Sequence, residues 1–228
     1  MVRNNIYTIF VTLFLGLIIA SCGGNDKNEP SRKFIAGEEA KGRTVFETYC
    51  TACHQPDGKG KIGFGPSINN QDFLSLADDE LIKTFILEGR PGTTMMPFKS
   101  IPDVKKDINH LVAFIRSWEK DYELFKPVQV DKAWKSHGDS KNGDRLFTSY
   151  CASCHGEKGV GYIAGGSGTG IGNAAFLKLV SDDYIKQTLI TGRVGTAMQS
   201  FAGAKGIAHL TDSDMDDIIS YLREGISN

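Results

Sequence analysis

The sequence predicts an all-α protein that is built from two copies of one small helical unit. Apolar residues recur at helical spacing in several stretches, and no stretch of useful length alternates apolar and polar residues as a half-buried strand does. The second half of the chain also repeats the first half in order, so that Gly42 and Phe46 correspond to Gly143 and Phe147. Insertions between the matched stretches fall in loops, which tolerate added length. The ordered matches therefore indicate two copies of one domain.

Composition and charge narrow the class of protein. The chain has 228 residues, of which 40% are hydrophobic and 23% are charged, as in ordinary soluble domains. Its formal net charge is -1 and it contains no basic tract, so we expect no nucleic acid partner. The cysteines form two pairs at matching positions of the copies, and Cys22 is left over.

The N-terminus has the pattern of a secretory signal. Arg3 precedes an apolar run at 6–20, which Ser21 and Cys22 follow. The run is shorter than the ~20 residues that a membrane-spanning helix needs. The stretch 19–22 resembles the lipobox of bacterial lipoproteins, in which cleavage precedes the cysteine and the thiol is then acylated. This resemblance implies a lipid anchor on Cys22, with an uncleaved short anchor or a plain signal peptide as the alternatives.

Breaks in helical periodicity predict the domain boundaries. The stretch after Cys22 is polar and contains glycine and proline, which is typical of a flexible tether. The join between the copies lies near Pro127, where no helical stripe continues. The predicted organisation is a lipoprotein signal peptide at 1–21, a tether at 22–34, a first domain at 35–125, a linker at 126–135 and a second domain at 136–228.

Each copy is expected to contain three helices and one cysteine-bearing turn. The first helix, near 38–49, places Val45, Phe46 and Tyr49 on one side. Thr211 and Asp214 predict an N-terminal cap for the last helix of the second copy. The other expected helices lie near 79–88 and 182–190 in the middle of the copies, and around 108–115 and 215–222 at their ends.

One pattern, C-x-x-C-H, occurs in both copies. Its members are Cys50, Cys53 and His54 in the first copy, and Cys151, Cys154 and His155 in the second. Cysteines at this spacing lie on one face of a helical turn, so both sulfurs reach one edge of a porphyrin, and the following imidazole ligates the iron. The pattern is typical of c-type haem attachment. A thioredoxin-like redox pair or half of a zinc site is the alternative, but neither copy has a nearby second pair to complete four zinc ligands.

With these motifs and this helix order, each copy resembles a class I c-type cytochrome domain, and the pair resembles the di-haem cytochromes that arise by duplication. The resemblance covers 36–228 and implies that each domain is a small helical fold around a covalently bound haem. It also implies that Gly42 and Gly143 lie where the first helix crosses the last, facing Phe114 and Tyr221. A glycine at a crossing lets two helix backbones approach closely.

The resemblance further implies how each iron is held. The loop with Pro66 is similar to the loop whose proline carbonyl accepts the proton of the ligating histidine. Thr169 takes this place in the second domain, in a softer glycine-rich stretch, so we expect the two haems to differ in potential. Met95 and Met198 correspond to the distal methionine ligand, whose thioether raises the potential. Met96 competes with Met95 because a proline follows it, but the register of the repeat favours Met95.

The remaining histidines and the two tryptophans are expected to have structural roles and not to bind iron or substrate. His110, His137 and His209 have no counterpart in the other copy, so we expect surface or capping histidines rather than iron ligands. Trp118 and Trp134 flank the join, and we expect them to pack the two domains together.

The resemblance implies an electron-transfer protein rather than an enzyme, with two covalently attached c-type haems as cofactors. Irons that are saturated by histidine and methionine leave no open position for a substrate. Expected partners are redox proteins, namely a quinol-oxidising complex, a terminal oxidase or a reductase, and membrane lipid through Cys22. The expected location is the bacterial cell envelope, on the periplasmic or outer face of a membrane. The alternatives are a di-haem oxidoreductase, peroxidase-like or acting on sulfur compounds, and a fixed cytochrome subunit of a quinol-oxidising or oxidase complex.

Overall fold

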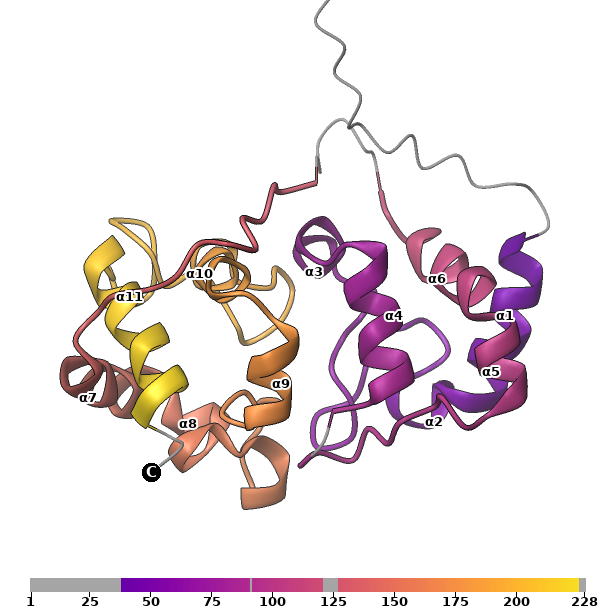
Figure 1. Cartoon of the computed structure of the whole chain (residues 1–228), viewed down its shortest axis with the longest axis horizontal. Coiled ribbons are helices and arrows are strands. Elements are labelled where there is room, and N and C mark those ends of the chain that lie inside the picture. The colour runs from indigo at the N-terminus through magenta and orange to yellow at the C-terminus, as the bar shows by residue number, and fades with distance from the viewer. Residues whose placement is uncertain (1–37, 91, 121–126, 226–228) are drawn as a thin grey trace, which may run out of the picture. The chain divides into compact units, whose positions relative to one another are not determined.

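The structure is a computed structural model that describes residues 38–90, 92–120 and 127–225 (Figure 1). Within these ranges there is no β-strand, only two isolated bridges, so the all-α prediction is confirmed. None of the described helices is long and apolar enough to cross a membrane. The predicted signal peptide, the tether and the lipidation site at Cys22 lie outside the described residues.

Two similar sets of helices follow each other along the chain, and we call them repeat one and repeat two. Repeat one comprises α1 (Glu38–Tyr49), α2 (Thr51–His54), α3 (Gln71–Leu76), α4 (Asp79–Glu88), α5 (Pro102–Lys106) and α6 (Ile108–Arg116). Repeat two comprises α7 (Ser140–Tyr150), α8 (Ala152–His155), the 3-10 segments η1 (Glu157–Gly159) and η2 (Gly161–Ala164), α9 (Ala174–Leu179), α10 (Asp182–Thr191), α11 (Asp212–Ser220) and the π-helical segment η3 (Tyr221–Gly225).

The longer expected helices are all observed. Those predicted near 38–49, 79–88 and 182–190 are α1, α4 and α10, and the last helices are α6 and α11. The predicted cap of α11 is also present. The backbone N–H of Asp214 donates to Thr211 Oγ1 at 3.2 Å, and the N–H of Thr211 donates back to the Asp214 carboxylate at 2.9 Å. This capping box satisfies two N–H groups that the helix itself leaves free.

The short helices α3 and α9 were not expected, because six residues are too few to show an apolar period. Each begins at an asparagine N-cap. The Asn70 side chain accepts from the N–H of Phe73 at 3.0 Å, and the Asn173 side chain accepts from the N–H of Ala175 at 2.8 Å. An asparagine before a short apolar run is the sequence signal that predicts such a helix.

Glycine allows the first and last helices of each repeat to cross closely. In repeat one, a Cβ built on Gly42 of α1 would overlap the carbonyl oxygen of His110 in α6. In repeat two, a Cβ on Gly143 of α7 would overlap the carbonyl oxygen of Asp217 in α11. Figure 1 shows α1 beside α6 and α7 beside α11. A side chain at either glycine would therefore push two helices apart.

A pair of aromatic rings packs beside each crossing. The ring centroids of Phe46 and Phe114 are 5.3 Å apart, as are those of Phe147 and Tyr221. Tilted ring pairs of this kind contribute about 0.5–1.5 kcal/mol beyond the area that they bury. The expected crossing of the first and last helices, with these residues facing each other, is confirmed in both repeats.

A buried arginine at the end of α6 ties repeat one together. The Arg116 side chain is 0% exposed, and its Nε donates to Asp79 Oδ1 at 2.7 Å. Its Nη1 donates to the carbonyl of Leu74 at 2.6 Å and to Glu119 at 2.7 Å, and its Nη2 donates to the carbonyl of Ala77. One guanidinium thus holds the C-terminal end of α3 and the start of α4 against α6.

Repeat two has an arginine with equivalent hydrogen bonds at the matching position. Arg223 donates from Nε to Asp182 Oδ1 at 2.6 Å, from Nη2 to the carbonyl of Val180 at 2.8 Å, and from Nη1 to the carbonyl of Leu177. Asp182 is only 3% exposed. Its buried carboxylate is paired with this arginine and also accepts a hydrogen bond from the N–H of Ser136 at 2.9 Å. The helix before the methionine loop is therefore locked to the last helix in both repeats.

The expectation that the tryptophans pack the two domains together is wrong for Trp118. Its ring centroid lies 5.2 Å from that of Phe46 and 5.0 Å from that of Phe114, so it completes the aromatic cluster of repeat one. The Trp134 ring lies under the ammonium of Lys186, which belongs to α10 of repeat two, at 5.0 Å. Each contact is within one repeat, because the chain folds back onto its own helices on either side of the join.

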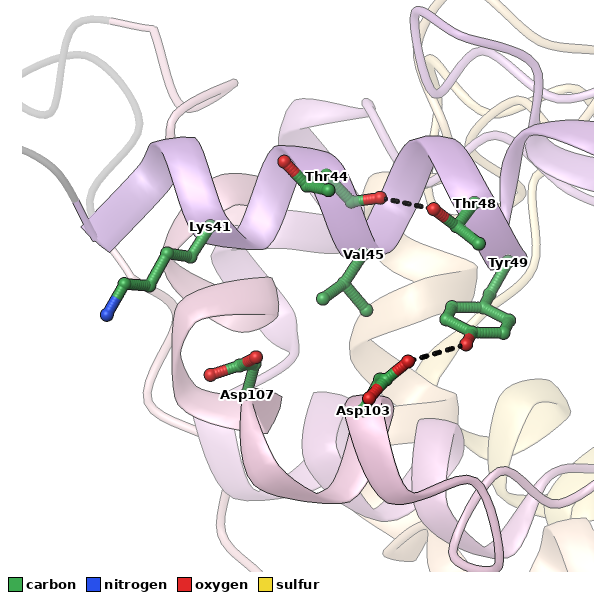
Figure 2. Close-up of a pocket in the computed structure, with 7 residues that line it drawn as sticks. All are labelled: Lys41, Thr44, Val45, Thr48, Tyr49, Asp103 and Asp107. Atoms are coloured by element: carbon green, nitrogen blue, oxygen red, sulfur yellow. Dashed lines mark hydrogen bonds between the residues drawn. The ribbon is translucent and has the colours of Figure 1, made fainter.

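A small cavity of about 260 Å³ lies between α1 and α5 (Figure 2). Two hydrogen bonds join residues of its wall. The Tyr49 hydroxyl donates to Asp103 Oδ2 at 3.0 Å, and the Thr48 hydroxyl donates to the carbonyl of Thr44 at 2.8 Å. The bond to the Asp103 carboxylate raises the pKa of Tyr49. The bond between Tyr49 and Asp103 holds α5 against α1, whereas the bond of Thr48 lies within α1.

Candidate haem-binding sites

A cavity of about 810 Å³ is lined by both repeats. Most of its wall is apolar, and a few polar groups converge on it, which is typical of a cofactor site. The lining includes every predicted cofactor-binding and iron-ligating residue, namely Cys50, Cys53, His54, Pro66, Met95, Cys151, Cys154, His155 and Met198, together with Thr169. The structure therefore brings together residues that are far apart in the sequence.

The cysteine-bearing turns have the same geometry in both repeats. The N–H groups of Cys53 and His54 donate to the carbonyl of Cys50 at 3.2 and 2.9 Å, which makes one tight helical turn. The corresponding bonds of repeat two have the same lengths. One turn thus presents two thiols and an imidazole to the same cavity.

Each histidine is oriented by a backbone carbonyl. His54 Nδ1 lies 2.9 Å from the carbonyl oxygen of Pro66, and His155 Nδ1 lies 2.7 Å from that of Thr169. A carbonyl only accepts, so Nδ1 bears the proton and Nε2 keeps its lone pair. Burial lowers the pKa of both histidines, and the charge of Arg90 lowers that of His155 further. Both imidazoles are therefore neutral near pH 7 and able to ligate a metal.

The surroundings of Cys50 and Cys151 do not favour a redox pair. Burial, with a smaller contribution from the neighbouring cysteine, raises the pKa of Cys50 and of Cys151 to about 12. Reactive redox cysteines instead have lowered pKa values. In the described part of the chain, no three or more His, Cys, Asp or Glu side chains are grouped to hold a metal ion. This arrangement disfavours both the thioredoxin-like and the zinc alternatives.

The methionine loops of the two repeats match in detail. The N–H of Arg90 donates to the carbonyl of Met95 at 2.8 Å, and the N–H of Arg193 donates to the carbonyl of Met198 at 2.5 Å. The N–H of each methionine donates to the threonine two residues before it, at 3.2 and 3.1 Å. Met95 and Met198 therefore occupy equivalent positions.

Met96 differs from both of them. It is 63% exposed, whereas Met95 and Met198 are partly buried, although all three border the cavity. A ligand that must exclude water from iron is better placed on the more buried residue. The loop geometry and the burial both favour Met95.

The remaining histidines lie away from this cavity. His110 Nδ1 is 3.1 Å from Asp107 Oδ1, and His209 Nδ1 is 3.2 Å from the carbonyl of Gly203. His137 is exposed. None of the three is among the described residues that line the cavity. These positions agree with the interpretation as surface or capping residues.

An iron porphyrin fits this donor set. In each repeat, two thiols on one turn suit thioether bonds, a neutral imidazole with a fixed tautomer suits the proximal iron position, and a partly buried thioether suits the distal one. The apolar wall supplies the low-dielectric surroundings that such a group needs. Arg90 also lines the cavity, although no motif marks it as a site residue. In the sequence, only the arginine at the matching position of repeat two, Arg193, indicates that Arg90 has a role.

Comparison with known proteins agrees with this geometry. The profile of the family described as "Cytochrome C oxidase, cbb3-type, subunit III" matches the chain twice, over residues 37–115 and 138–222. Subunit FixP of the cbb3-type cytochrome c oxidase from Azorhizobium caulinodans is 29% identical over 175 residues, which cover 73% of this chain and 55% of that protein. Subunit CcoP from Rhodobacter capsulatus is 27% identical over 198 residues, which cover 79% of this chain and 60% of that protein.

The matches have limits in length and in structural similarity. The chain spans little more than half the length of these relatives. A chain of the Kuenenia stuttgartiensis reducing HAO-like protein complex has a TM-score of 0.50 at 21% identity, over 82% of this chain and 95% of that chain, which supports the fold alone. The double match confirms the predictions of two tandem cytochrome c domains and of two c-type haems. With one match on each repeat, this chain belongs to the cytochrome c oxidase, cbb3-type, subunit III family.

Proposed function

We propose that this protein transfers single electrons between redox proteins as a di-haem cytochrome c. The observation that supports the proposal is the pair of matched sites, each with a neutral histidine and a partly buried methionine on the same cavity. A bound c-type haem supplies a one-electron iron couple. Two iron ligands from the protein in each site leave no position for a substrate, so we infer a carrier and not an enzyme.

The roles of the site residues follow from their chemistry. When haem is bound, the cysteine pairs would form the thioether bonds, and the two motif histidines together with Met95 and Met198 would ligate the irons. The carbonyls of Pro66 and Thr169 hold the Nδ1 proton and so fix the ring orientation. Because Thr169 lies in a glycine-rich loop, we propose that the second haem has a different potential.

The surface of repeat one suits electron exchange with a partner. Ile62, Phe64 and Met96 are 76%, 51% and 63% exposed, and all three border the cavity. We call them the apolar rim. The Thr94 hydroxyl donates to the carbonyl of Phe64 at 3.2 Å, which joins the rim to the methionine loop. A partner that covers the rim would exclude water next to the site.

The family supports a role as the cytochrome subunit of a terminal oxidase, and we propose this complex as the partner. We further propose that acylation of Cys22 anchors the protein to the outer or periplasmic side of a bacterial membrane, with 22–34 as the tether. The proposed haem domains are 35–125 and 136–228, joined by 126–135. An anchor of this kind would raise the effective concentration of the partner.

We expect Met95→Ala to make one haem high-spin in the ferric spectrum and to lower its potential, because a thioether stabilises ferrous iron. Met198→Ala should do the same to the other haem. Met96→Ala is the matched control and should leave both haems low-spin. The measurement is visible and paramagnetic resonance spectroscopy of each purified variant. A high-spin haem in Met96→Ala, with Met95→Ala unchanged, would reverse the assignment.

The functional proposal is tested on the full chain, purified in detergent from membranes of its host. We expect two low-spin haems per chain, full reduction by two electrons in a redox titration, and co-elution with an oxidase complex. A mobile carrier would give the same spectra but elute alone, and would refute only the fixed-subunit role. One high-spin haem that reacts with peroxide in the wild type would contradict the electron-carrier role.

A further inference from the structure

Arg90 is a cation at an unusual place in the cavity wall. It follows α4 in repeat one, and the residue as a whole is only half-buried. Its Nε, however, is fully enclosed and has no hydrogen-bond partner. Burial lowers the pKa of Arg90 to about 10, so the guanidinium is still charged near pH 7.

The guanidinium of Arg90 is held against repeat two. Its Nη2 donates to the carbonyl of Gly170 at 2.7 Å, and its central carbon lies 4.1 Å from the ring centroid of Phe176. It also lies 5.7 Å from the ring centroid of Phe85 in its own repeat. The two rings stack with their centroids 6.2 Å apart, and the cation covers them.

Two other arginines, the buried Arg116 and the partly buried Arg223, show what is missing at Arg90. Arg116 has Asp79 as its anion, and Arg223 has Asp182. Among the residues that the structure describes, no carboxylate forms an ion pair with Arg90. A partly buried charge without an anion beside it is costly, so an anion is expected at this place. Because Arg90 lines the cavity, this charge points to an anion that binds inside the cavity.

The ligand of this cavity has the required chemistry. A haem is apolar except for its iron and two propionate carboxylates, and Arg90 lines the cavity in which both sites place a haem. We propose that Arg90 binds a haem propionate with the part of its guanidinium that faces the cavity and, by holding the Gly170 carbonyl at the same time, connects the two haem sites. This inference rests on the proposed binding of haem.

Arg90 is therefore a positioning residue for the second site as well. Gly170 directly follows Thr169, whose carbonyl orients His155. An arginine of repeat one thus braces the loop that fixes the proximal ligand of repeat two. Its counterpart Arg193 is bonded inside repeat two, to the carbonyl of Gly192 at 2.9 Å and to the side chain of Thr188 at 3.0 Å. Only one of the two arginines can connect the sites in this way.

The test compares Arg90→Met and Arg90→Lys with the wild-type holoprotein. Arg145→Met is the control, because Arg145 is exposed and donates its hydrogen bonds to Asn142 of its own helix. Two haems per chain are expected in every variant, because the cysteines attach them. Loss of one cation, with a propionate left unpaired, favours ferric iron. At a fixed applied potential, the ferric-to-ferrous ratio of one haem should rise about tenfold in Arg90→Met, because one unit charge is removed at a distance where solvent screens it only partly. A tenfold change in this ratio corresponds to a lowering of the reduction potential by ~59 mV for one electron.

A second measurement separates propionate binding from a purely structural role. The resonance Raman band for propionate bending reports hydrogen bonding to the carboxylate, and it should shift in Arg90→Met and in Arg90→Lys but not in Arg145→Met. Unchanged potentials and an unchanged band in both Arg90 variants, with two haems attached, would overturn the proposal. If Arg90→Met does not fold, the propionate band of Arg90→Lys alone tests whether Arg90 binds a propionate. Absence of haem from the wild type would instead refute the proposed function.

Discussion

Replacing Cys50 and Cys53 by alanine is expected to reduce covalently bound haem from two equivalents per chain to one. Both thiols lie on a single helical turn at the cavity, and no other described cysteine of repeat one is present to take over. Without the thioether bonds, a haem is held only by its axial ligands and by apolar contacts, so it is lost on denaturation. The measurement is the mass of the denatured chain, expressed in a host that attaches c-type haem.

The loss should also destabilise repeat one, because a bound haem would occupy the part of the cavity that repeat one lines. Hydrogen exchange at α1, α4 and α6 should become faster, whereas α7, α10 and α11 should change less. The matched variant, with Cys151 and Cys154 replaced by alanine, should show the opposite pattern. If the denatured chain of either double variant still had the mass of a chain with two haems, the assignment of these cysteines as attachment sites would be wrong.

Arg116→Met is expected to lower the free energy of unfolding of repeat one by about 3 kcal/mol, with the haem-attachment residues intact. The change leaves the buried carbonyls of Leu74 and Ala77 without a donor, at about 1–3 kcal/mol each. The ion pair with Asp79 contributes less, because that carboxylate is 45% exposed. Equilibrium urea unfolding, followed by far-UV circular dichroism, gives the difference.

The repeat provides an internal comparison for this prediction. Arg223→Met leaves Asp182, whose side chain is 4% exposed, without its cation, so we expect a loss in repeat two that is at least as large. The exposed residue Arg145 serves as the control, and Arg145→Met should change the free energy by less than about 0.5 kcal/mol. If Arg116→Met were as stable as Arg145→Met, the carbonyls of α3 would have found other donors, and the proposed lock between α4 and α6 would be wrong.

Both predictions depend on features that the sequence marks to different degrees. The cysteines stand in a local motif whose spacing has one physical reason, so they could be named without a structure. Arg116 and Arg223 appear in the sequence only as a repeated basic residue at the end of an apolar helix. Their acceptors are backbone carbonyls at the ends of α3 and α9, which no side-chain pattern identifies.

The methionine loop falls between these cases. The repeat register favoured Met95, and the matched hydrogen bonds of Met95 and Met198 support the same choice. The tryptophans show the opposite outcome. Proximity to the join suggested a domain contact for Trp118, but its ring packs on Phe46 and Phe114, because a residue near a boundary in sequence can still belong to one core.

The sequence by itself determined the duplication, the helical class and the cysteine-bearing turns, since each follows from a short motif, a period or an ordered repeat. The close crossings at Gly42 and Gly143 came only from the resemblance to a known family, and the structure confirms them. Only the tertiary structure decided which groups lie together across long separations: the carbonyls that Arg116 satisfies, and the contact of Arg90 with Gly170 and Phe176. The two repeats have nearly equal local patterns but different neighbours. Packing thus makes Arg90 and Arg193 unequal, because the environment of a buried charge is set by residues that are distant in the chain.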